Sequence, residues 1–198
     1  MERRRLTTQV TVLAVMLFSG AMLRAMAAGN QGSAAATPEQ TKARAERGAY
    51  LVGMMGCNDC HTPWKMGAQG PEPDMSRALT GHPQDMVLPP PPAPSGPWIW
   101  HGAATNTAFA GPWGVSFTAN LTPDPDTGLG KWTEAMFIAT MRTGRHQGKG
   151  RPILPPMPAK MIGKATDEDL KSIFAYLQSR PPVKNRVPAP IDPPEAKK

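Results

Sequence analysis

Apolar residues recur at helical spacing in three stretches of the chain, at about 37–55, 134–142 and 166–179. Each stretch begins at or directly after a threonine that can cap a helix, and a glycine or prolines follow the last two. The sequence therefore predicts three helices with these approximate limits. Their caps would be Thr37, Thr133 and Thr166, and their inward-facing side chains Ala45, Ala49, Tyr50, Val52, Ala135, Phe137, Ile138, Met141, Leu170, Ile173, Phe174 and Leu177.

Gly48 interrupts the first helical pattern. A glycine inside a helix costs about 1 kcal/mol relative to alanine. Two interpretations stay open: another helix crosses closely at this point, or the glycine lies on the solvent-exposed face.

The N-terminal segment has the layout of a secretory signal. Three arginines, Arg3 to Arg5, precede an apolar run from Val10 to Leu23, and Ala25-Met26-Ala27 follows. The run is shorter than the roughly 20 residues that a membrane-spanning helix needs. We therefore expect a cleaved signal peptide over residues 1–27 rather than a retained anchor, and a flexible lead over residues 28–36.

The stretch between the first two helices, residues 62–119, is rich in proline. The chain contains 24 prolines and 19 glycines, and prolines forbid helix or central strand over most of this stretch. We therefore expect an irregular insertion in an otherwise all-α domain. Its large aromatic side chains would pack on the domain or, alternatively, form a docking surface. They are Trp64, Trp98, Trp100, Phe109, Trp113 and Phe117.

Length and charge limit the organisation of the chain. The 198 residues carry a formal charge of +7, of which the segment before residue 28 contributes +3. The remaining +4 is mild, and no basic run resembles a nucleic-acid-binding surface. We expect one domain over residues 37–183, followed by a mobile tail over residues 184–198.

The segment Cys57-Asn58-Asp59-Cys60-His61 is the motif that carries chemistry, and its cysteines are the only two in the chain. The spacing is that of covalent haem attachment. Sulfurs three residues apart lie on one helical turn, so both can form thioethers to the vinyl groups of one porphyrin. His61 can then present its imidazole to the iron. The sequence thus predicts one covalently bound haem c.

Three other uses of the thiols are weighed against haem attachment. A disulfide would close a very short loop and gain little from closure. A thioredoxin-like redox pair would follow a strand, whereas a helical pattern precedes Cys57. A zinc site needs four ligands, and the remaining histidines, His82, His101 and His146, lack a paired metal spacing. Haem attachment is the favoured interpretation.

The second axial ligand is predicted at Met157. Prolines on both sides restrict the backbone and could hold the thioether against the iron. Met141, Met161 and His146 remain rivals, because any one of 13 methionines is more often a packing residue. Ligation by His61 and Met157 would fill both faces of the iron and raise its reduction potential, which is typical of an electron carrier and not of an enzyme.

Five cations surround the predicted distal ligand along the sequence. They could form a positive rim that steers an acidic partner towards the haem edge, or they could serve solubility alone. These residues are Arg145, Lys149, Arg151, Lys160 and Lys164.

Three elements, taken in order, resemble the class I cytochrome c domain. They are a helix ending in the Cys57–His61 motif, a proline-bounded Met157 and a closing helix from Leu170 to Leu177. The resemblance covers about Glu39 to Arg180. It implies a cytochrome c-like helical domain around a covalently bound haem, in which the first and last helices cross at Gly48.

A narrower resemblance is to the cytochrome c subunits of periplasmic membrane-bound dehydrogenases. It is carried by four short segments, at residues 119–124, 127–130, 155–158 and 167–170. The resemblance implies that the aromatic residue at the helix crossing is Tyr50 or Tyr176. Those subunits usually carry several haem motifs, whereas this chain has one.

These patterns predict a periplasmic cytochrome that passes single electrons between redox protein partners. The donor would be a dehydrogenase or a quinol-oxidising protein, and the acceptor an oxidase or another cytochrome. We expect no nucleic acid partner and no membrane span after signal cleavage, although the protein could associate with the periplasmic face of the inner membrane.

Two alternatives to a free electron carrier stay open. The first is a haem enzyme or gas sensor with an open distal site. The second is an electron-transfer subunit fixed in a larger respiratory or dehydrogenase complex, with the insertion around Pro89 to Trp100 as its anchor.

Overall fold

The computed structural model describes residues 37–92 and 97–193. The expected signal peptide, the flexible lead and the last five residues of the chain lie outside these ranges. The description below therefore concerns the unit that begins at Pro38. None of its described helices is long and apolar enough to cross a bilayer.

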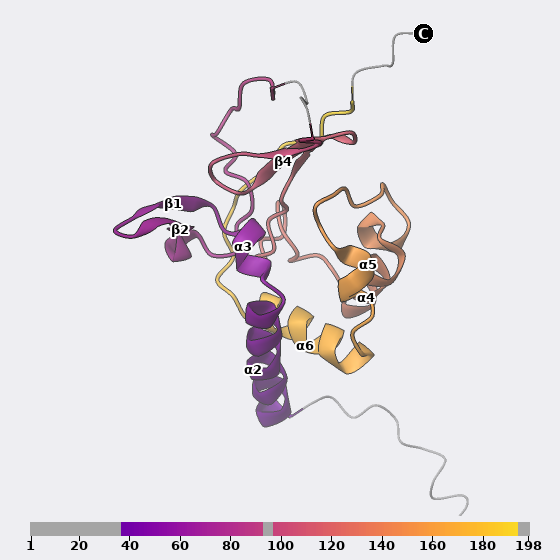
Figure 1. The fold of residues 1–198 in the computed structure, drawn as a ribbon. Coiled ribbons are helices and arrows are strands. Elements are labelled where there is room, and N and C mark those ends of the chain that lie inside the picture. The colour runs from indigo at the N-terminus through magenta and orange to yellow at the C-terminus, as the bar shows by residue number, and fades with distance from the viewer. Residues whose placement is uncertain (1–36, 93–96, 194–198) are drawn as a thin grey trace, which may run out of the picture. The chain divides into compact units, whose positions relative to one another are not determined.

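Helices surround one side of the core (Figure 1). They are α2 (Pro38–Met54), α3 (Cys57–His61), α4 (Glu134–Thr143), α5 (Ala159–Ile162) and α6 (Asp167–Gln178), with the short 3-10 helices η1 (Met75–Arg77) and η2 (His146–Gly148). The three long helices have nearly the limits that the apolar pattern predicts. Their buried side chains include Leu51, Val52, Phe137, Met141, Leu170, Ile173, Phe174 and Leu177.

Side-chain caps fix the starts of the last two long helices. The Thr133 hydroxyl accepts a hydrogen bond from the amide of Met136 at 3.2 Å, and the Thr166 hydroxyl accepts one from Asp169 at 3.1 Å. Gly144 ends α4 in the left-handed region, with φ 65°. Such caps satisfy amide and carbonyl groups that have no partner within the helix.

Replacing Thr166 with alanine is expected to lower the free energy of unfolding by about 1 kcal/mol, because the Asp169 amide loses its acceptor. Chemical denaturation followed by far-UV circular dichroism measures the change. Ser179→Ala is the control, since its hydroxyl only donates to the Tyr176 carbonyl at the exposed end of the same helix. Equal losses for the two variants would contradict the capping role.

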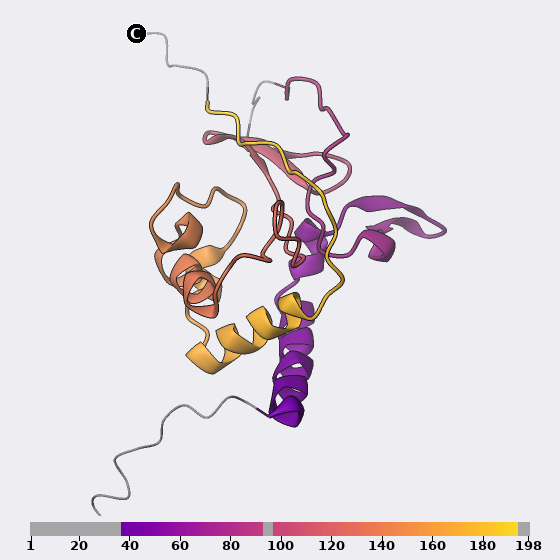
Figure 2. The ribbon, with the colours of Figure 1, turned by 180° about the vertical axis from the view of Figure 1, so that it is seen from behind.

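Helices α2 and α6 cross in direct backbone contact at Gly48 (Figures 1 and 2). A Cβ atom on Gly48 would lie 1.9 Å from the Ser172 carbonyl oxygen and 2.7 Å from Cβ of Tyr176. Arg47 forms an ion pair with Asp169 across the same crossing, at 2.9 Å. The interpretation of Gly48 as a crossing point is thus confirmed, and the aromatic residue beside it is Tyr176. Tyr50 is 58% exposed.

The prediction of an all-α domain is wrong, because the insertion forms two antiparallel sheets. One pairs β1 (Trp64–Gly67) with β2 (Gly70–Pro73), and the other has the order β3 (His101–Gly102), β4 (Ala108–Gly111) and β5 (Gly114–Phe117). Two-residue turns close the β1–β2 and β4–β5 hairpins. Prolines are compatible with this arrangement where they lie on an edge strand, as in β2, or in a turn, as at Pro112.

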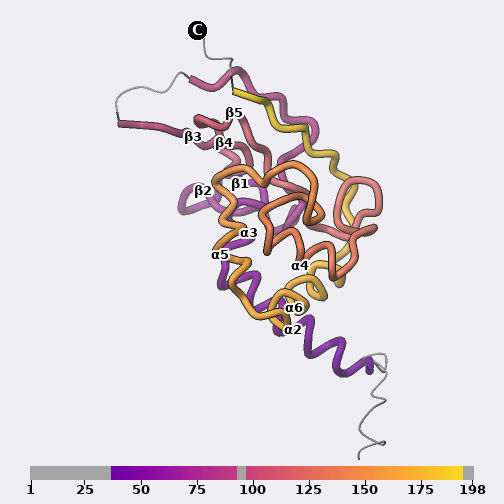
Figure 3. Tube along the Cα trace, turned by 90° about the vertical axis from the view of Figure 1, so that its right-hand side faces the viewer, coloured from indigo at the N-terminus to yellow at the C-terminus, as the bar shows by residue number. Residues whose placement is uncertain are grey.

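Residues 183–192, here called the C-terminal strap, run from the end of α6 to the three-stranded sheet (Figures 2 and 3). A mobile tail is the prediction from sequence for residues 184–198. Ile191 forms a bridge with Val115 of β5, with reciprocal backbone hydrogen bonds of 2.8 and 2.9 Å. Gly114 permits this approach, because a Cβ atom there would lie 2.0 Å from the Ile191 carbonyl oxygen.

Candidate functional site

The short helix α3 carries the two cysteines and His61 on one turn. Gly56 precedes it in the left-handed region, with φ 65°, and so redirects the chain out of α2. The thiols are not joined in a disulfide. Two hydrogen bonds brace the helix from the insertion, since Trp64 Nε1 and Asn106 Nδ2 both donate to the Asp59 carbonyl, at 2.8 and 2.7 Å.

The environment of the thiols does not suit a redox pair. Burial raises the pKa of the Cys57 thiol to about 11, and burial together with the charge of Asp59 raises the pKa of Cys60. Redox-active cysteines instead have a lowered pKa that supplies thiolate at neutral pH. Within the described residues, no group of three or more His, Cys, Asp or Glu side chains could hold a metal ion. Both observations leave haem attachment as the best use of the motif.

His61 is buried and held in one tautomer. Its Nδ1 donates to the carbonyl oxygen of Ala119 at 2.8 Å, and only 7% of the residue is exposed. Burial lowers the pKa of the imidazole, which favours the neutral ring. Because Nδ1 carries the proton, the lone pair is on Nε2, and this is the arrangement that a metal-ligating histidine requires.

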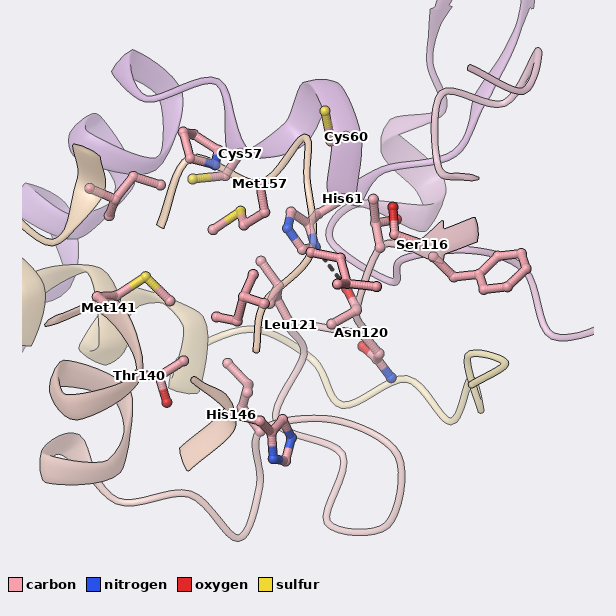
Figure 4. Close-up of a pocket in the computed structure, with 18 of the residues that line it drawn as sticks. Cys57, Cys60, His61, Ser116, Asn120, Leu121, Thr140, Met141, His146 and Met157 are labelled. Carbon is pink, nitrogen blue, oxygen red and sulfur yellow. Dashed lines mark hydrogen bonds between the residues drawn. The ribbon is translucent and has the colours of Figure 1, made fainter. Parts of the chain in front are cut away.

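An apolar cavity lies against α3 (Figure 4). In the close-up, the side chains of His61, Met141 and Met157 point into one common space, with the α3 cysteines at its upper edge and His146 on the far side. The walls combine the motif residues with large apolar side chains from both helices and sheet. These include Phe109, Phe117, Leu121, Leu129, Phe137 and Ile153.

Two side chains of the insertion therefore face the cavity, as the packing interpretation predicts, and others do not. Phe109 and Phe117 line it from β4 and β5. Trp98 is 69% exposed and Trp100 is 44% exposed.

Met157 lines the same cavity from the loop between η2 and α5. The Ser116 hydroxyl of β5 donates to the Pro155 carbonyl at 2.7 Å, which fixes this loop two residues before the methionine. Among the rivals, Met141 and His146 also line the cavity, whereas Met161 does not and is 61% exposed. Met157 is thus one of the side chains that the structure brings to the site together with the cysteines and His61.

The donor set and the walls of the cavity fit a covalently attached haem. Two reduced thiols lie on one turn beside a neutral imidazole with a free Nε2, and a thioether enters the same apolar space. Apolar walls exclude water from the iron and its porphyrin. The fold and the site together define a c-type haem protein.

Sequence comparison gives the family. The family model for cytochrome c matches residues 45–181, and the chain belongs to the cytochrome c family, whose covalent haem c transfers electrons. This confirms the resemblance inferred from the motif, the proline-bounded methionine and the closing helix.

The relatives are cytochrome subunits of dehydrogenases and one larger dehydrogenase subunit. The chain is 37% identical over 86 residues to a subunit of the nicotinate dehydrogenase of Pseudomonas putida, which covers 43% of this chain and 7% of that protein. It is 28% identical over 142 residues to the cytochrome c subunit of the alcohol dehydrogenase (quinone) of Gluconacetobacter polyoxogenes, which covers 72% and 23%. The fructose dehydrogenase cytochrome subunit of Gluconobacter japonicus is 31% identical over 90 residues, or 42% and 18%. Each match spans less than a quarter of the relative.

The supports of the two candidate ligands do not stand out in the sequence. The Ala119 carbonyl is a backbone group, so no residue type marks it. Ser116 is one serine in a strand that the prolines obscure. A strand pattern at residues 108–117, with glycine and proline at its turn, was the available signal.

Proposed function

We propose that this chain is an electron-transfer cytochrome with one haem, held by thioethers to Cys57 and Cys60 and ligated axially by His61 and Met157. The observation that carries the proposal is the convergence of two reduced thiols, a neutral imidazole with a free Nε2 and a thioether on one apolar cavity. When bound, the haem supplies a single-electron couple at its iron. The axial side chains would fill both positions at the metal, so we assign the chain no catalytic reaction.

The protein residues would tune this couple in two ways. The Ala119 carbonyl raises the basicity of the His61 imidazole through Nδ1, and the Met157 thioether favours the reduced iron. The apolar walls disfavour an increase in charge at the metal and keep water away from it. Each effect concerns electron transfer and none offers a place for a substrate.

Carbon monoxide binding distinguishes this function from that of a gas sensor or haem enzyme. If Met157 occupies the distal position, the reduced native protein is expected not to bind carbon monoxide within minutes. A stopped-flow spectrum measures this directly. Rapid binding at neutral pH would show that the distal position is open, and the electron-carrier proposal would then be wrong.

Export to the periplasm forms part of the proposal. Its support is the basic and apolar layout of the first 27 residues and the need of the haem motif for maturation outside the cytoplasm. The intact mass of the mature protein tests it, since cleavage after Ala27 leaves Ala28 as the first residue. A mass that includes residues 1–27 would contradict cleavage.

We further propose a dehydrogenase as the electron donor, because the relatives are named as cytochrome subunits or larger subunits of such enzymes. A free carrier and a fixed subunit are both compatible with this donor. Exposure of Trp98 and Ile99, at 69% and 63%, favours a fixed contact surface in the insertion. Loss of a co-purifying dehydrogenase after Trp98→Ala would support the fixed subunit, and its retention would favour another contact.

The basic segment from Gly144 to Thr166 is proposed to steer anionic partners. It contains no acidic residue, and among the described residues none of its five Lys and Arg side chains forms an ion pair. Arg151 also lines the cavity. Electrostatic steering of this kind weakens as salt screens the charges.

Oxidation of the reduced protein by ferricyanide is expected to slow by roughly tenfold as ionic strength rises from about 0.01 M to 0.5 M. The double variant Lys149→Gln/Arg151→Gln should be slower at low salt and less sensitive to salt. Lys131→Gln is the control, because Lys131 already pairs with Asp126 at 3.0 Å. A flat salt dependence of the unmodified protein would exclude steering.

A further inference from the structure

The C-terminal strap lies outside the residues that match the family, which end at 181, yet it contacts the support of His61. Its central residue, Asn185, is only 4% exposed. The Asn185 amide nitrogen Nδ2 donates to the carbonyls of Thr80 and His82, at 2.6 and 2.9 Å, and Oδ1 accepts from the backbone amide of Gln84 at 2.9 Å. One side chain thus fixes three backbone groups of the loop 80–84.

The loop 80–84 in turn holds both His61 and the strand that supports it. The Gly81 amide donates to the His61 carbonyl at 2.8 Å, and the His82 amide donates to the Thr118 carbonyl at 3.0 Å. Gly81 lies so close that a Cβ atom there would be 2.6 Å from the Ala119 carbonyl oxygen. This is the oxygen that accepts the Nδ1 proton of His61.

The strap holds the other side of the Ala119 peptide as well. Asn120 donates from Nδ2 to the Val183 carbonyl at 2.8 Å, and the Asn185 amide donates to the Thr127 hydroxyl at 3.0 Å. Asn120 is 3% exposed. The Ala119 peptide is therefore held from two sides through buried hydrogen bonds, and Asn185 takes part in both.

We propose that Asn185 is a positioning residue for His61: it holds the Ala119 carbonyl where it accepts the Nδ1 proton, and so sets the electron-donating strength of the imidazole. The inference rests on the proposed function, because His61 matters in this way only as an iron ligand. A stronger hydrogen bond from Nδ1 makes the imidazole more basic and favours the oxidised iron. A weaker one raises the reduction potential.

Asn185→Ala in the haem-loaded protein tests the proposal. The variant is expected to raise the reduction potential and to increase the exchange of the His61 Nδ1 proton with solvent at least tenfold, as followed by NMR of the reduced protein. Thr127→Val leaves the Asn185 side chain in place but removes the acceptor of its backbone amide, and a smaller change in the same direction is expected. This second variant decides the matter if Asn185→Ala does not fold.

Gln84→Ala is the matched control. It also removes a contact between strap and loop, the exposed hydrogen bond from the Arg186 amide to Gln84 Oε1, but it leaves the Asn185 bonds intact. It should change neither the potential nor the proton exchange. If Asn185→Ala and Thr127→Val lower stability but keep the potential and proton exchange of the unmodified protein, Asn185 is only structural and the inference is wrong. If the unmodified protein shows no histidine-ligated haem, it is the proposed function that fails.

Discussion

Replacing Met157 with alanine is expected to abolish the iron–thioether absorption band of the oxidised protein and to open the reduced iron to carbon monoxide. The reduction potential should fall by about 0.1 V or more, because axial ligands set haem potentials over a span of about 0.8 V and methionine favours the reduced state. Visible spectroscopy and a redox titration measure both changes. The physical reason is the position of the side chain in the same apolar cavity as His61.

Two other methionines provide the controls for this prediction. Met161→Ala should leave band and potential unchanged, since Met161 is exposed and outside the cavity. Met141→Ala should keep the band while lowering stability, since Met141 is a buried core residue on α4. Loss of the band in Met141→Ala and its retention in Met157→Ala would assign the distal position to Met141.

The second large effect is expected at the helix crossing. Gly48→Ala would place a Cβ atom 1.9 Å from the Ser172 carbonyl oxygen and 2.6 Å from its carbonyl carbon. These are backbone atoms of α6, so the helices must separate and expose core side chains. We expect a loss of about 3 kcal/mol or more in the free energy of unfolding, and a fall in melting temperature on the order of 10 °C.

Gly53→Ala on the same helix is the matched control, because a Cβ atom at Gly53 would have no neighbour within 4 Å. Alanine is the better helix former, so this variant should gain about 0.5–1 kcal/mol. Thermal unfolding of both variants separates helix propensity from packing. A Gly48→Ala protein as stable as the unmodified one would contradict the close crossing.

The parts of the fold that could be predicted are those fixed by local chemistry. Threonine caps and the apolar spacing of α4 and α6 depend on residues within one helix, so their limits follow from sequence. The haem motif is likewise local, since five consecutive residues contain both thiols and the imidazole. Gly48 required one more step, because its role depends on a helix more than 120 residues later.

The two sheets escape prediction for a physical reason. Prolines argue against strands in general, whereas β2 carries Pro71 and Pro73 on an edge strand and Pro112 lies in a turn. The strap could not be predicted either, because its contacts are hydrogen bonds from single polar residues, such as Asn185, to backbone carbonyls far away in the sequence. Such bonds leave no periodic pattern.

The covalent attachment of haem through Cys57 and Cys60 is the claim on which everything else depends. The direct measurement is the mass and colour of the denatured chain after acid–acetone extraction, following expression in a host that matures c-type cytochromes. We predict a coloured chain heavier by one haem, and free haem from the Cys57→Ser/Cys60→Ser variant. A colourless chain with the mass of the polypeptide alone would contradict covalent attachment.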